Sequence, residues 1–410
     1  MKIRAFKALR PPRELAATVA AVPYDVVDTE EARSLAKDNP LSFLRVSRPE
    51  LEFPAGWNMY ADEVYARAAE NFARLQAQGA LRQDSTPGLF VYSQRFGAHV
   101  QHGVVACLDT LEYEANIVRK HEKTRVDKEN DRVRHLEAIR AQSGPVFIAY
   151  RDDAAIDRLV ARAGTSEPLF RFTDVDGIEH AGWRLADPGA VVAAFARVPH
   201  CYIADGHHRA AAAARVAARL RSKGGSDGRD AGKPDDEWRW FLAVLFPASQ
   251  LRIFSINRLL KNLNGLAPED FLAAVRARFR VREQPDGEPQ GVGDVRMYVQ
   301  GRWYSLGWDV EEEVDPVACL DVSVLQERLL GPVLGVADPR TDARMEFVSG
   351  FLGSAELARR VERGAAQVGF AMYPVTIDQV MAVSDAGQIM PPKSTWFAPK
   401  LRSGLFVHLI

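Results

Sequence analysis

The stretch CYIADGHHRA, residues 201–210, is the part of the chain around which the rest can be arranged. An apolar run from Val198 to Ala204 predicts a short strand, and the alanine-rich segment from Ala210 to Leu220 predicts a helix. A strand, a turn with one glycine and a helix direct backbone N–H groups and the positive end of the helix dipole at one point. Because two histidines and an arginine stand at that point, the sequence predicts an anion site, and a phosphate is the anion that fits best.

Length and composition limit the classes of protein to which the chain can belong. Its 410 residues exceed the size at which one hydrophobic core stops growing, so two domains are expected. The 53 basic residues almost balance the 54 acidic ones, which argues against nucleic-acid binding over a broad basic surface. No apolar run approaches the roughly 18 residues of a membrane span. Cys107, Cys201 and Cys319 are far apart, which argues against a cysteine zinc site or a disulfide framework and predicts a cytoplasmic location.

The pattern of expected elements predicts the fold class and the domains. Strands and helices alternate irregularly, which favours an α+β fold with mixed sheets and flanking helices over a regular doubly wound sheet. Residues 1–222 are predicted to form a phosphate-binding domain that contains a charged helical insertion. Residues 223–237, rich in Gly, Ser, Asp and Lys, are predicted to be a linker or exposed loop. Residues 238–410 are predicted to form an α/β region that contributes a basic tail to the site, and the apolar segment Leu41–Val46 is predicted to be a strand.

The predicted corner supplies the first candidate residues, which are Asp205, Gly206, His207, His208 and Arg209. Arg209 would provide a planar fork of donors to a phosphate, and one histidine a donor or a proton shuttle. The plainer alternative is a helix capped by Asp205 with solvated histidines. Two histidines and an arginine at one cap favour the functional interpretation. A zinc site fits less well, because side chains at neighbouring helical positions point in different directions.

The densest charge in the chain lies between Arg119 and Arg140. It supplies candidate bases, magnesium ligands and phosphate-binding cations, namely His121, Glu122, Lys123, Arg125, Asp127, Glu129 and Arg132. Thr124 and Asp127 resemble a helix-start box. The alternative is a solvated helix whose opposite charges pair at helical spacing. The apolar stripe of this helix is thin, however, which favours a charged face turned inward to a site.

Two later segments add further candidates. In the turn Asp338–Arg344, Arg340 and Arg344 could clamp a substrate carboxylate, with a plain polar turn as the equal alternative. In the C-terminal tail the candidate substrate-binding residues are Lys393, Ser394, Thr395, Lys400 and Arg402. Prolines replace the glycines of a P-loop there, so the segment is not a Walker A motif, and it could equally serve only to pack. Tyr24 and Asp25 complete the polar candidates.

These motifs together resemble domain-of-unknown-function family 1015, a widespread bacterial and archaeal family. The resemblance rests on residues 23–26, 121–132, 205–209, 338–342 and 391–404. The Asp-Gly-His-His-Arg turn is also similar to the signature loop of the ParB/sulfiredoxin-like superfamily, which includes partition proteins, sulfiredoxin and free-serine kinases. This second resemblance implies a ParB/sulfiredoxin-like core in which residues 205–209 bind nucleotide phosphate.

The resemblance implies a nucleotide-dependent phosphotransferase that acts on a small hydroxy amino acid of the serine or phosphoserine type. Mg²⁺ and ADP or ATP are the implied cofactors, and a small molecule rather than nucleic acid is the implied partner. His207, His208, Glu122, Asp127 and Glu129 are the candidate acid–base residues. Two alternatives stay open: a phosphoserine phosphatase-like hydrolase, and a non-enzymatic nucleotide-dependent binding switch related to the partition proteins.

Overall fold

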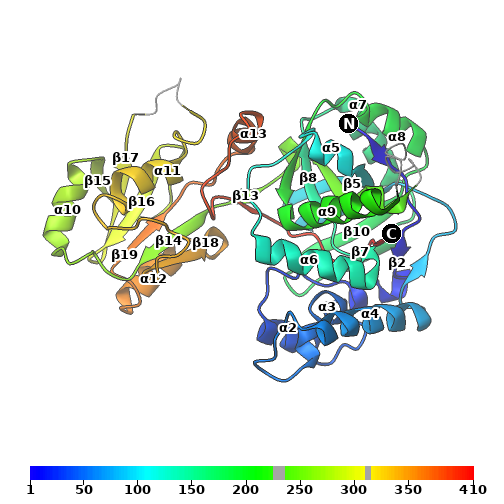
Figure 1. The fold of residues 1–410 in the computed structure, drawn as a ribbon. Helices are drawn as coiled ribbons and strands as arrows, with labels where there is room; N and C mark the ends of the chain where they lie inside the picture. Colours follow the sequence, from blue (N-terminus) through cyan, green and yellow to red (C-terminus); the bar gives the residue numbers. More distant parts are fainter. Residues whose placement is uncertain (225–235, 310–314) are drawn as a thin grey trace. The chain divides into compact units, whose positions relative to one another are not determined.

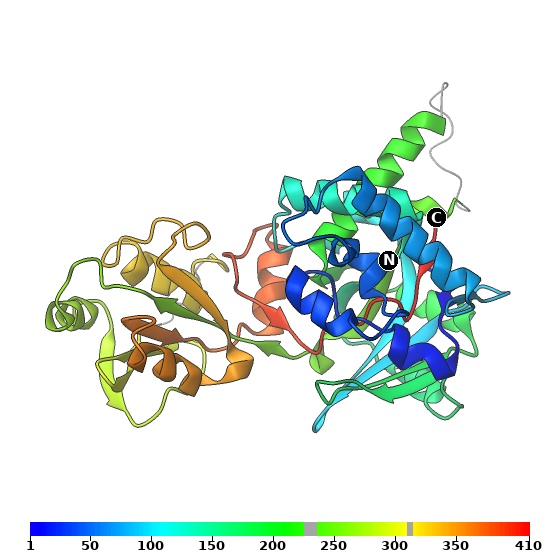
Figure 2. The same cartoon turned by 90° about the horizontal axis from the view of Figure 1, so that it is seen from below.

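The computed structural model describes residues 1–224, 236–309 and 315–410. The chain divides into two compact units (Figures 1 and 2). Unit 1 comprises Met1–Leu251 together with Pro399–Ile410, and unit 2 comprises Arg252–Ala398. The chain therefore leaves unit 1 once and returns to it for its last residues. Most of the expected linker, residues 225–235, lies outside the described residues.

Unit 1 is built on a nine-stranded mixed sheet. Its strands are β1 (Ile3–Arg4), β4 (Phe90–Phe96), β5 (His99–Asp109), β6 (Val118–Arg119), β8 (Val146–Tyr150), β9 (Phe170–Thr173), β10 (Glu179–Arg184), β11 (Cys201–Asp205) and β12 (Trp240–Pro247). The order is β6-β11-β8-β12-β5-β4-β10-β9, with β1 added on β5. The pairs β11–β6 and β12–β8 are parallel, and the other pairs are antiparallel. Two short antiparallel pairs accompany it: β2 (Leu9–Arg10) with β3 (Arg82–Gln83), and β7 (Ala141–Gln142) with β21 (His408–Leu409).

The helices of unit 1 pack on this sheet and on one another (Figure 1). They are α1 (Ala16–Val19), α2 (Thr29–Ala36), α3 (Leu44–Ser47), α4 (Asp62–Ala77), α5 (Thr110–Glu114), α6 (Val126–Ile139), α7 (Ala154–Ala163), α8 (Pro188–Phe195) and α9 (His207–Gly224). Helix α9 contacts β8 and β12, α6 packs on α9, and α4 packs on α6. The charged helix α6 thus lies between two other helices, which places part of its polar face inside the unit.

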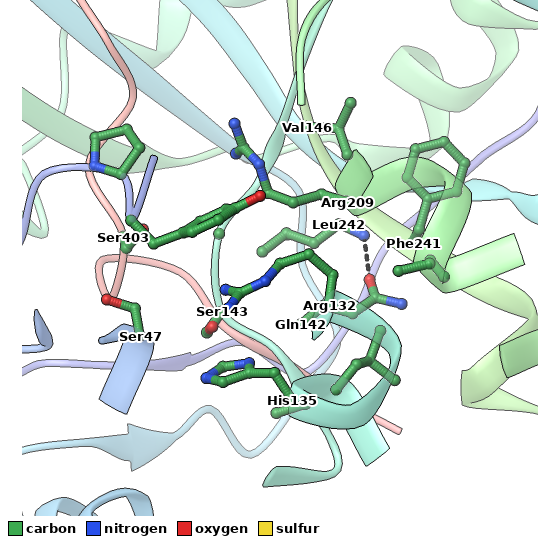
Figure 3. Close-up of a pocket in the computed structure, with 17 residues that line it drawn as sticks. Ser47, Arg132, His135, Gln142, Ser143, Val146, Arg209, Phe241, Leu242 and Ser403 are labelled. Carbon is green, nitrogen blue, oxygen red and sulfur yellow. Dashed lines mark hydrogen bonds between the residues drawn. The ribbon is translucent and has the colours of Figure 1, made fainter. Parts of the chain in front are cut away.

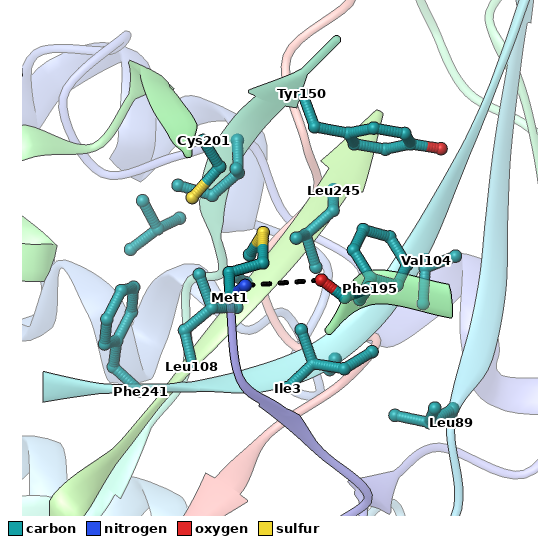
Figure 4. Packing of buried hydrophobic residues seen from close by; sticks show 14 of the residues in the cluster. Met1, Ile3, Leu89, Val104, Leu108, Tyr150, Phe195, Cys201, Phe241 and Leu245 are labelled. Carbon is teal, nitrogen blue, oxygen red and sulfur yellow. Dashed lines mark hydrogen bonds between the residues drawn. The ribbon is translucent and has the colours of Figure 1, made fainter. Parts of the chain in front are cut away.

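Figure 4 shows the main core of unit 1, which surrounds the N-terminus. Met1 is itself buried, and its ammonium group donates a hydrogen bond of 2.6 Å to the Val198 carbonyl and one of 3.3 Å to the Phe195 carbonyl. Phe195, Ile203 and Leu245 are fully buried in the same cluster, and α9 contributes its alanines. Small alanine side chains let this helix approach the sheet closely, which fixes the position of its first turn.

Unit 2 contains a six-stranded antiparallel sheet in the order β15-β17-β16-β19-β14-β18. Its strands and helices are β13 (Ile253–Phe254), β14 (Ile256–Leu260), α10 (Pro268–Arg276), β15 (Arg280–Gln284), β16 (Asp294–Val299), β17 (Arg302–Gly307), α11 (Asp321–Leu325), β18 (Met345–Ser349), α12 (Ser354–Glu362), β19 (Val368–Ala371), α13 (Ile377–Asp385) and β20 (Trp396–Phe397). Strands β13 and β20 pair where the chain enters and leaves the unit. Unit 2 is thus a separate region of helices and sheet.

The prediction of an α+β fold with mixed sheets and flanking helices is confirmed. Two details differ from expectation. The second region begins at Arg252 rather than at residue 238, because β12 is fully buried between β5 and β8 in the sheet of unit 1. The predicted strand Leu41–Val46 is wrong: residues 44–47 form α3, whose buried Leu44 and Val46 pack with Phe72 of α4. In the described parts of the chain, no helix has the length and apolar character needed to cross a membrane.

Candidate functional site

The corner between β11 and α9 has the geometry that its sequence predicts. Strand β11 ends at Asp205, Gly206 adopts a φ of +95°, and α9 begins at His207, three residues earlier than the alanine run suggested. Arg209 and Ala210 donate their backbone N–H groups to the Gly206 carbonyl, at 2.9 and 3.0 Å. The N–H groups that precede them have no acceptor within the helix. These groups and the helix dipole make the corner electropositive.

Asp205 is held by two cations. Lys400 Nζ lies 2.5 Å from Oδ1, and Arg209 Nη2 lies 2.6 Å from Oδ2. Burial by itself would raise the pKa of this carboxyl, but the charges of Lys400 and Arg209 outweigh burial and lower the pKa to about 2. Lys400 belongs to the C-terminal segment that returns to unit 1, so this residue of the predicted basic tail contacts the corner.

Arg209 folds back over the turn that it follows. A Cβ atom at position 206 would lie 2.9 Å from Arg209 Cζ, so only glycine leaves room for the guanidinium. Besides Asp205, the Pro145 carbonyl accepts a hydrogen bond from Arg209 Nη1. The remaining nitrogen, Nε, is buried without a partner among the described residues. Two of the three guanidinium nitrogens of Arg209, which was expected to bind a phosphate, are therefore used to stabilise the turn.

Two neutral histidines lie side by side behind the corner. The rings of His121 and His207 meet edge to face with centroids 4.6 Å apart. Burial lowers the pKa of His121 to about 4, against the opposing charge of Asp205, and burial and the neighbouring His121 lower the pKa of His207. His121 Nδ1 and His207 Nε2 are buried, and neither has a hydrogen-bond partner among the described residues. His207 Nδ1 lies 3.5 Å from the carboxylate of Glu122, which is more than half exposed.

His208, which follows His207 in the chain, has a hydrogen-bond partner on its ring. The backbone N–H of Arg125 donates to His208 Nε2 at 3.0 Å, so the basic nitrogen of the neutral ring is already in use. Burial also lowers the pKa of His208, against the charges of Asp25, Glu129 and Asp127. The side chain of Arg125 turns to Asp127, with Nη2 to Oδ2 at 2.8 Å, and both are exposed. This contact attaches the start of α6 to the first turn of α9.

Helix α6 turns a charged face inward, as its thin apolar stripe indicated. Glu129 accepts hydrogen bonds from Arg215 of α9 at 2.7 Å and from the Thr124 hydroxyl at 2.8 Å. Asp131 is buried between Arg132, 2.6 Å away, and the hydroxyl of Tyr65, 2.8 Å away. The predicted helix-start box is wrong, because Arg125 is the N-cap residue and no side chain caps the helix. Asp127 pairs with Arg125, two residues before it, rather than with a residue at helical spacing.

A cavity of about 50 Å³ lies beside Arg209. Figure 3 shows that its labelled residues come from distant parts of unit 1, including Ser47, Arg132, His135, Arg209 and Ser403. The guanidinium of Arg132 stacks on the ring of Tyr24, 3.8 Å from its centroid. Burial raises the pKa of the Tyr24 phenol to about 12, although Arg132 opposes the shift. Tyr24 and Arg132 are among the residues that the sequence singles out, whereas Ser143, which also lines the cavity, is not.

The remaining candidates divide between the two units. Arg402 lies in unit 1, where Nε is 3.1 Å from Asp174 Oδ2 and Nη2 is 3.0 Å from Asp176 Oδ2. Five others belong to unit 2: Arg340, Arg344, Lys393, Ser394 and Thr395. Arg340 and Arg344 pair with Asp338 and Asp342, two residues before each, so both form local ion pairs. Their assignment to substrate stays a prediction.

Arg215, Asp174 and Pro145 contact the site and were not anticipated from the sequence. Arg215 follows Arg209 by six residues within an alanine-rich helix, and only the position of α6 makes it a partner of Glu129. Asp174 lies in a turn between two strands and meets the tail 228 residues later. Helical periodicity could have indicated Arg215, but no local signal indicates the other two.

The side chains around the corner do not form a site for the implied Mg²⁺. The described residues contain no group of three or more His, Cys, Asp and Glu side chains arranged to hold a metal ion. Both oxygens of Asp205 are bound by cations, and Glu129 is bound by Arg215 and Thr124. The residues present therefore do not fit a preformed magnesium site.

Comparison with known proteins gives the family. Residues 3–323 match DUF1015, which is described as a protein of unknown function. The chain belongs to this family. The matched range contains residues 119–140 and 205–209, whereas the Asp338 turn and the residues of the C-terminal tail lie beyond it. No curated protein matches the chain.

Several solved structures are distantly similar to this member of DUF1015. A mutant free serine kinase in complex with ADP has a TM-score of 0.35 and 14% identity, over 74% of this chain and 92% of its own. A conserved hypothetical protein from Pyrococcus furiosus has a TM-score of 0.35 and 14% identity, over 75% and 95%. SbnI with a C-terminal truncation, from Staphylococcus aureus, has a TM-score of 0.38 and 10% identity, over 74% and 87%. At this distance the similarities assign no function.

Proposed function

We propose that unit 1 is a phosphotransferase that acts on a small hydroxy amino acid of the serine or phosphoserine type: it transfers a phosphoryl group from ADP or ATP to the hydroxyl of serine, which gives phosphoserine. The observation that carries the proposal is the set of buried nitrogens without partners around Gly206: His121 Nδ1, His207 Nε2 and Arg209 Nε. Buried polar atoms in folded proteins are almost always hydrogen-bonded, so a cluster of exceptions favours a bound ligand, and the helix N-terminus favours an anionic one.

The charges of the corner support a phosphate as that ligand. Lys400 and Arg209 bring two positive charges against the one negative charge of Asp205. Burial holds the rings of His121 and His207 neutral, so neither adds positive charge to the corner. Phosphate oxygens would share the two cations with Asp205 and accept from the first N–H groups of α9. Such preorganised donors stabilise the charge on a transferring phosphoryl group.

Glu122 and His207 are the proposed base. Glu122 is exposed and lies 3.5 Å from His207 Nδ1, so it can orient the ring and take up a proton. His208 is less suited, because its basic nitrogen accepts the Arg125 N–H. Glu129 is likewise bound on both oxygens. In the transfer, the acceptor oxygen forms a bond to phosphorus, the bond from phosphorus to the nucleotide oxygen breaks, and the hydroxyl proton passes to Glu122 or His207.

The test is turnover by the purified full-length protein, followed by ³¹P NMR. Three reactions are compared: L-serine with ADP, L-serine with ATP, and phosphoserine alone. We expect phosphoserine to form in at least one of the first two reactions and Glu122→Gln to lower kcat by roughly 10²–10⁴-fold, the usual contribution of a general base. Release of phosphate from phosphoserine alone would favour a hydrolase instead. Correctly folded protein that is inactive in all three would contradict both reactions, and nucleotide-dependent retention of DNA would then favour the binding switch.

A further inference from the structure

The cavity beside Arg209 has a wall that carries positive charge and no negative charge. Its lining consists of Pro23, Tyr24, Ser47, Arg132, His135, Leu136, Ala141, Gln142, Ser143, Gly144, Val146, Arg209, Ala212, Ala213, Phe241, Leu242 and Ser403. Two guanidinium groups belong to this wall, and no Asp or Glu does (Figure 3). Asp131 and Asp205, which pair with the two arginines, are not among the lining residues. A wall of this kind favours an anion inside the cavity.

Several hydroxyl groups that line the cavity are available to donate hydrogen bonds to a ligand. Among the described residues, the hydroxyls of Tyr24, Ser143 and Ser403 make no side-chain hydrogen bond that would occupy them. Tyr24 keeps its proton, since burial raises its pKa to about 12, so it can donate. The cavity therefore offers several donors from three separate segments to one small acceptor group.

We propose that this cavity binds the carboxylate of a small hydroxy acid, with Arg132 and Arg209 as its charged partners. The inference rests on the proposed function and places the acceptor substrate of that reaction. The carboxylate is thereby assigned to Arg132 and Arg209 instead of to Arg340 and Arg344, which form local ion pairs in unit 2. Because Arg209 borders both the cavity and the corner, an acceptor in the cavity lies next to the proposed phosphate position.

The size and polarity of the cavity select this class of ligand. One buried water needs roughly 10–15 Å³ of such space, so about 50 Å³ holds about three to five waters, which suits the carboxylate end of a small acid. A nucleoside is too large. The lining also includes the apolar side chains of Leu136, Val146 and Phe241. A free phosphate would set charged oxygens against these side chains, whereas a hydroxy acid presents carbon to them and its carboxylate to the arginines.

The experiment is calorimetric titration of the full-length protein with L-serine, L-serinamide, inorganic phosphate and ADP. We expect L-serine to bind and L-serinamide, which lacks the carboxylate, not to bind. Arg132→Gln removes one cavity guanidinium and should weaken L-serine binding by about 10- to 100-fold, the usual effect of a hydrogen bond to a charged group. Arg95→Gln is the matched control, because Arg95 is exposed on β4 and lies outside the cavity lining. It should leave the affinity unchanged.

Arg132→Gln leaves the buried Asp131 without its cation, so this variant can fail to fold. A second variant then provides the test. Ala212→Val adds volume to the cavity wall and changes no charge, so it should reduce L-serine binding while ADP binding persists. L-serine binding that survives in both variants would overturn the proposal. So would Arg132-dependent binding of inorganic phosphate without binding of L-serine.

The ADP titration separates this inference from the proposed function. Arg132-dependent binding of L-serine in a protein that binds no ADP would support the cavity assignment and contradict the phosphotransferase. Binding of ADP without binding of L-serine would overturn the cavity assignment and leave nucleotide binding at the corner intact.

Discussion

Residues at the corner both stabilise the turn and line the candidate site. Arg209 holds Asp205 and the Pro145 carbonyl, and it also lines the cavity. Gly206 is required by its positive φ and by the guanidinium packed against it. His121 and His207 are kept neutral by burial, so they add no positive charge to the corner. The residue types were readable in the sequence, but their partners were not.

Replacement of Arg209 tests the corner directly. Arg209→Ala should lower the affinity for ADP by about tenfold or more, because hydrogen bonds to charged groups contribute about 1.5–3 kcal/mol. Arg219→Ala is the control: Arg219 lies on the same helix, is half exposed and pairs with Glu137. Calorimetric titration measures the affinities, and circular dichroism checks the fold. Equal ADP affinities in the Arg209 variant and the native protein would remove the corner from the site.

Burial of His121 predicts a pH dependence of stability. Its pKa is about 4 in the folded protein and about 6.5 in the unfolded chain. The unfolded state therefore binds a proton first, so stability is complete above about pH 6.5 and falls as the pH drops toward 4, by ~3 kcal/mol in all. His121→Gln should flatten this part of the curve, measured by urea unfolding at a series of pH values. An unchanged slope between pH 6.5 and 4 would show that His121 does not titrate as stated.

At the scale of elements, the turn between β11 and α9 determines where the residues of the candidate site lie. The strand fixes Asp205, the glycine reverses the chain, and the alanines of α9 hold the helix against the sheet. Helix α6 then packs on α9 and brings Arg125 to His208 and Glu129 to Arg215. Local sequence predicted the strand and the helix, because apolar runs and alanine content act over short distances. It misjudged Leu41–Val46, where packing against α4 favours a helix despite the apolar pattern.

Gly206→Ala tests the strain in this turn. A side chain at positive φ costs roughly 1–2 kcal/mol, and the contact of the new Cβ with Arg209 at 2.9 Å adds to that cost. Gly97→Ala is a matched control, since Gly97 also has a positive φ of +58°, but an added Cβ there would meet no atom within 4 Å. Urea unfolding should show a larger loss of stability at position 206 than at position 97. Equal losses would mean that Arg209 moves aside without cost.

At the scale of the whole molecule, the C-terminal segment completes unit 1 after an excursion through unit 2 that runs from Arg252 to Ala398. Lys400 reaches Asp205, and Gln94 Nε2 donates to the Lys400 carbonyl at 2.9 Å. Arg402 is buried against Asp174, which also bonds His180 at 2.8 Å. These contacts anchor the segment on both sides of Leu401. Long-range contacts therefore complete the corner.

Asp174→Asn tests this anchor. Removing the carboxylate leaves the buried Arg402 without its main partner, which typically costs about 3–5 kcal/mol. Hydrogen exchange of residues 399–410 should increase, and ADP affinity should fall because Lys400 is no longer fixed. Asp176→Asn is the control: Asp176 is more than half exposed, and its loss should change neither quantity much. Retained protection of the tail in Asp174→Asn would contradict the anchor.

The sequence alone determined the class of fold, the corner at residues 205–209 and the inward turn of the charged helix, because each depends on local pattern: apolar runs, one glycine and a thin apolar stripe. The tertiary structure decided the rest. It placed β12 in the sheet of unit 1, returned Lys400 to Asp205 and formed the cavity from Tyr24, Arg132 and Ser403. Such contacts join residues far apart along the chain, and which of the possible pairings forms depends on how the helices and strands pack together.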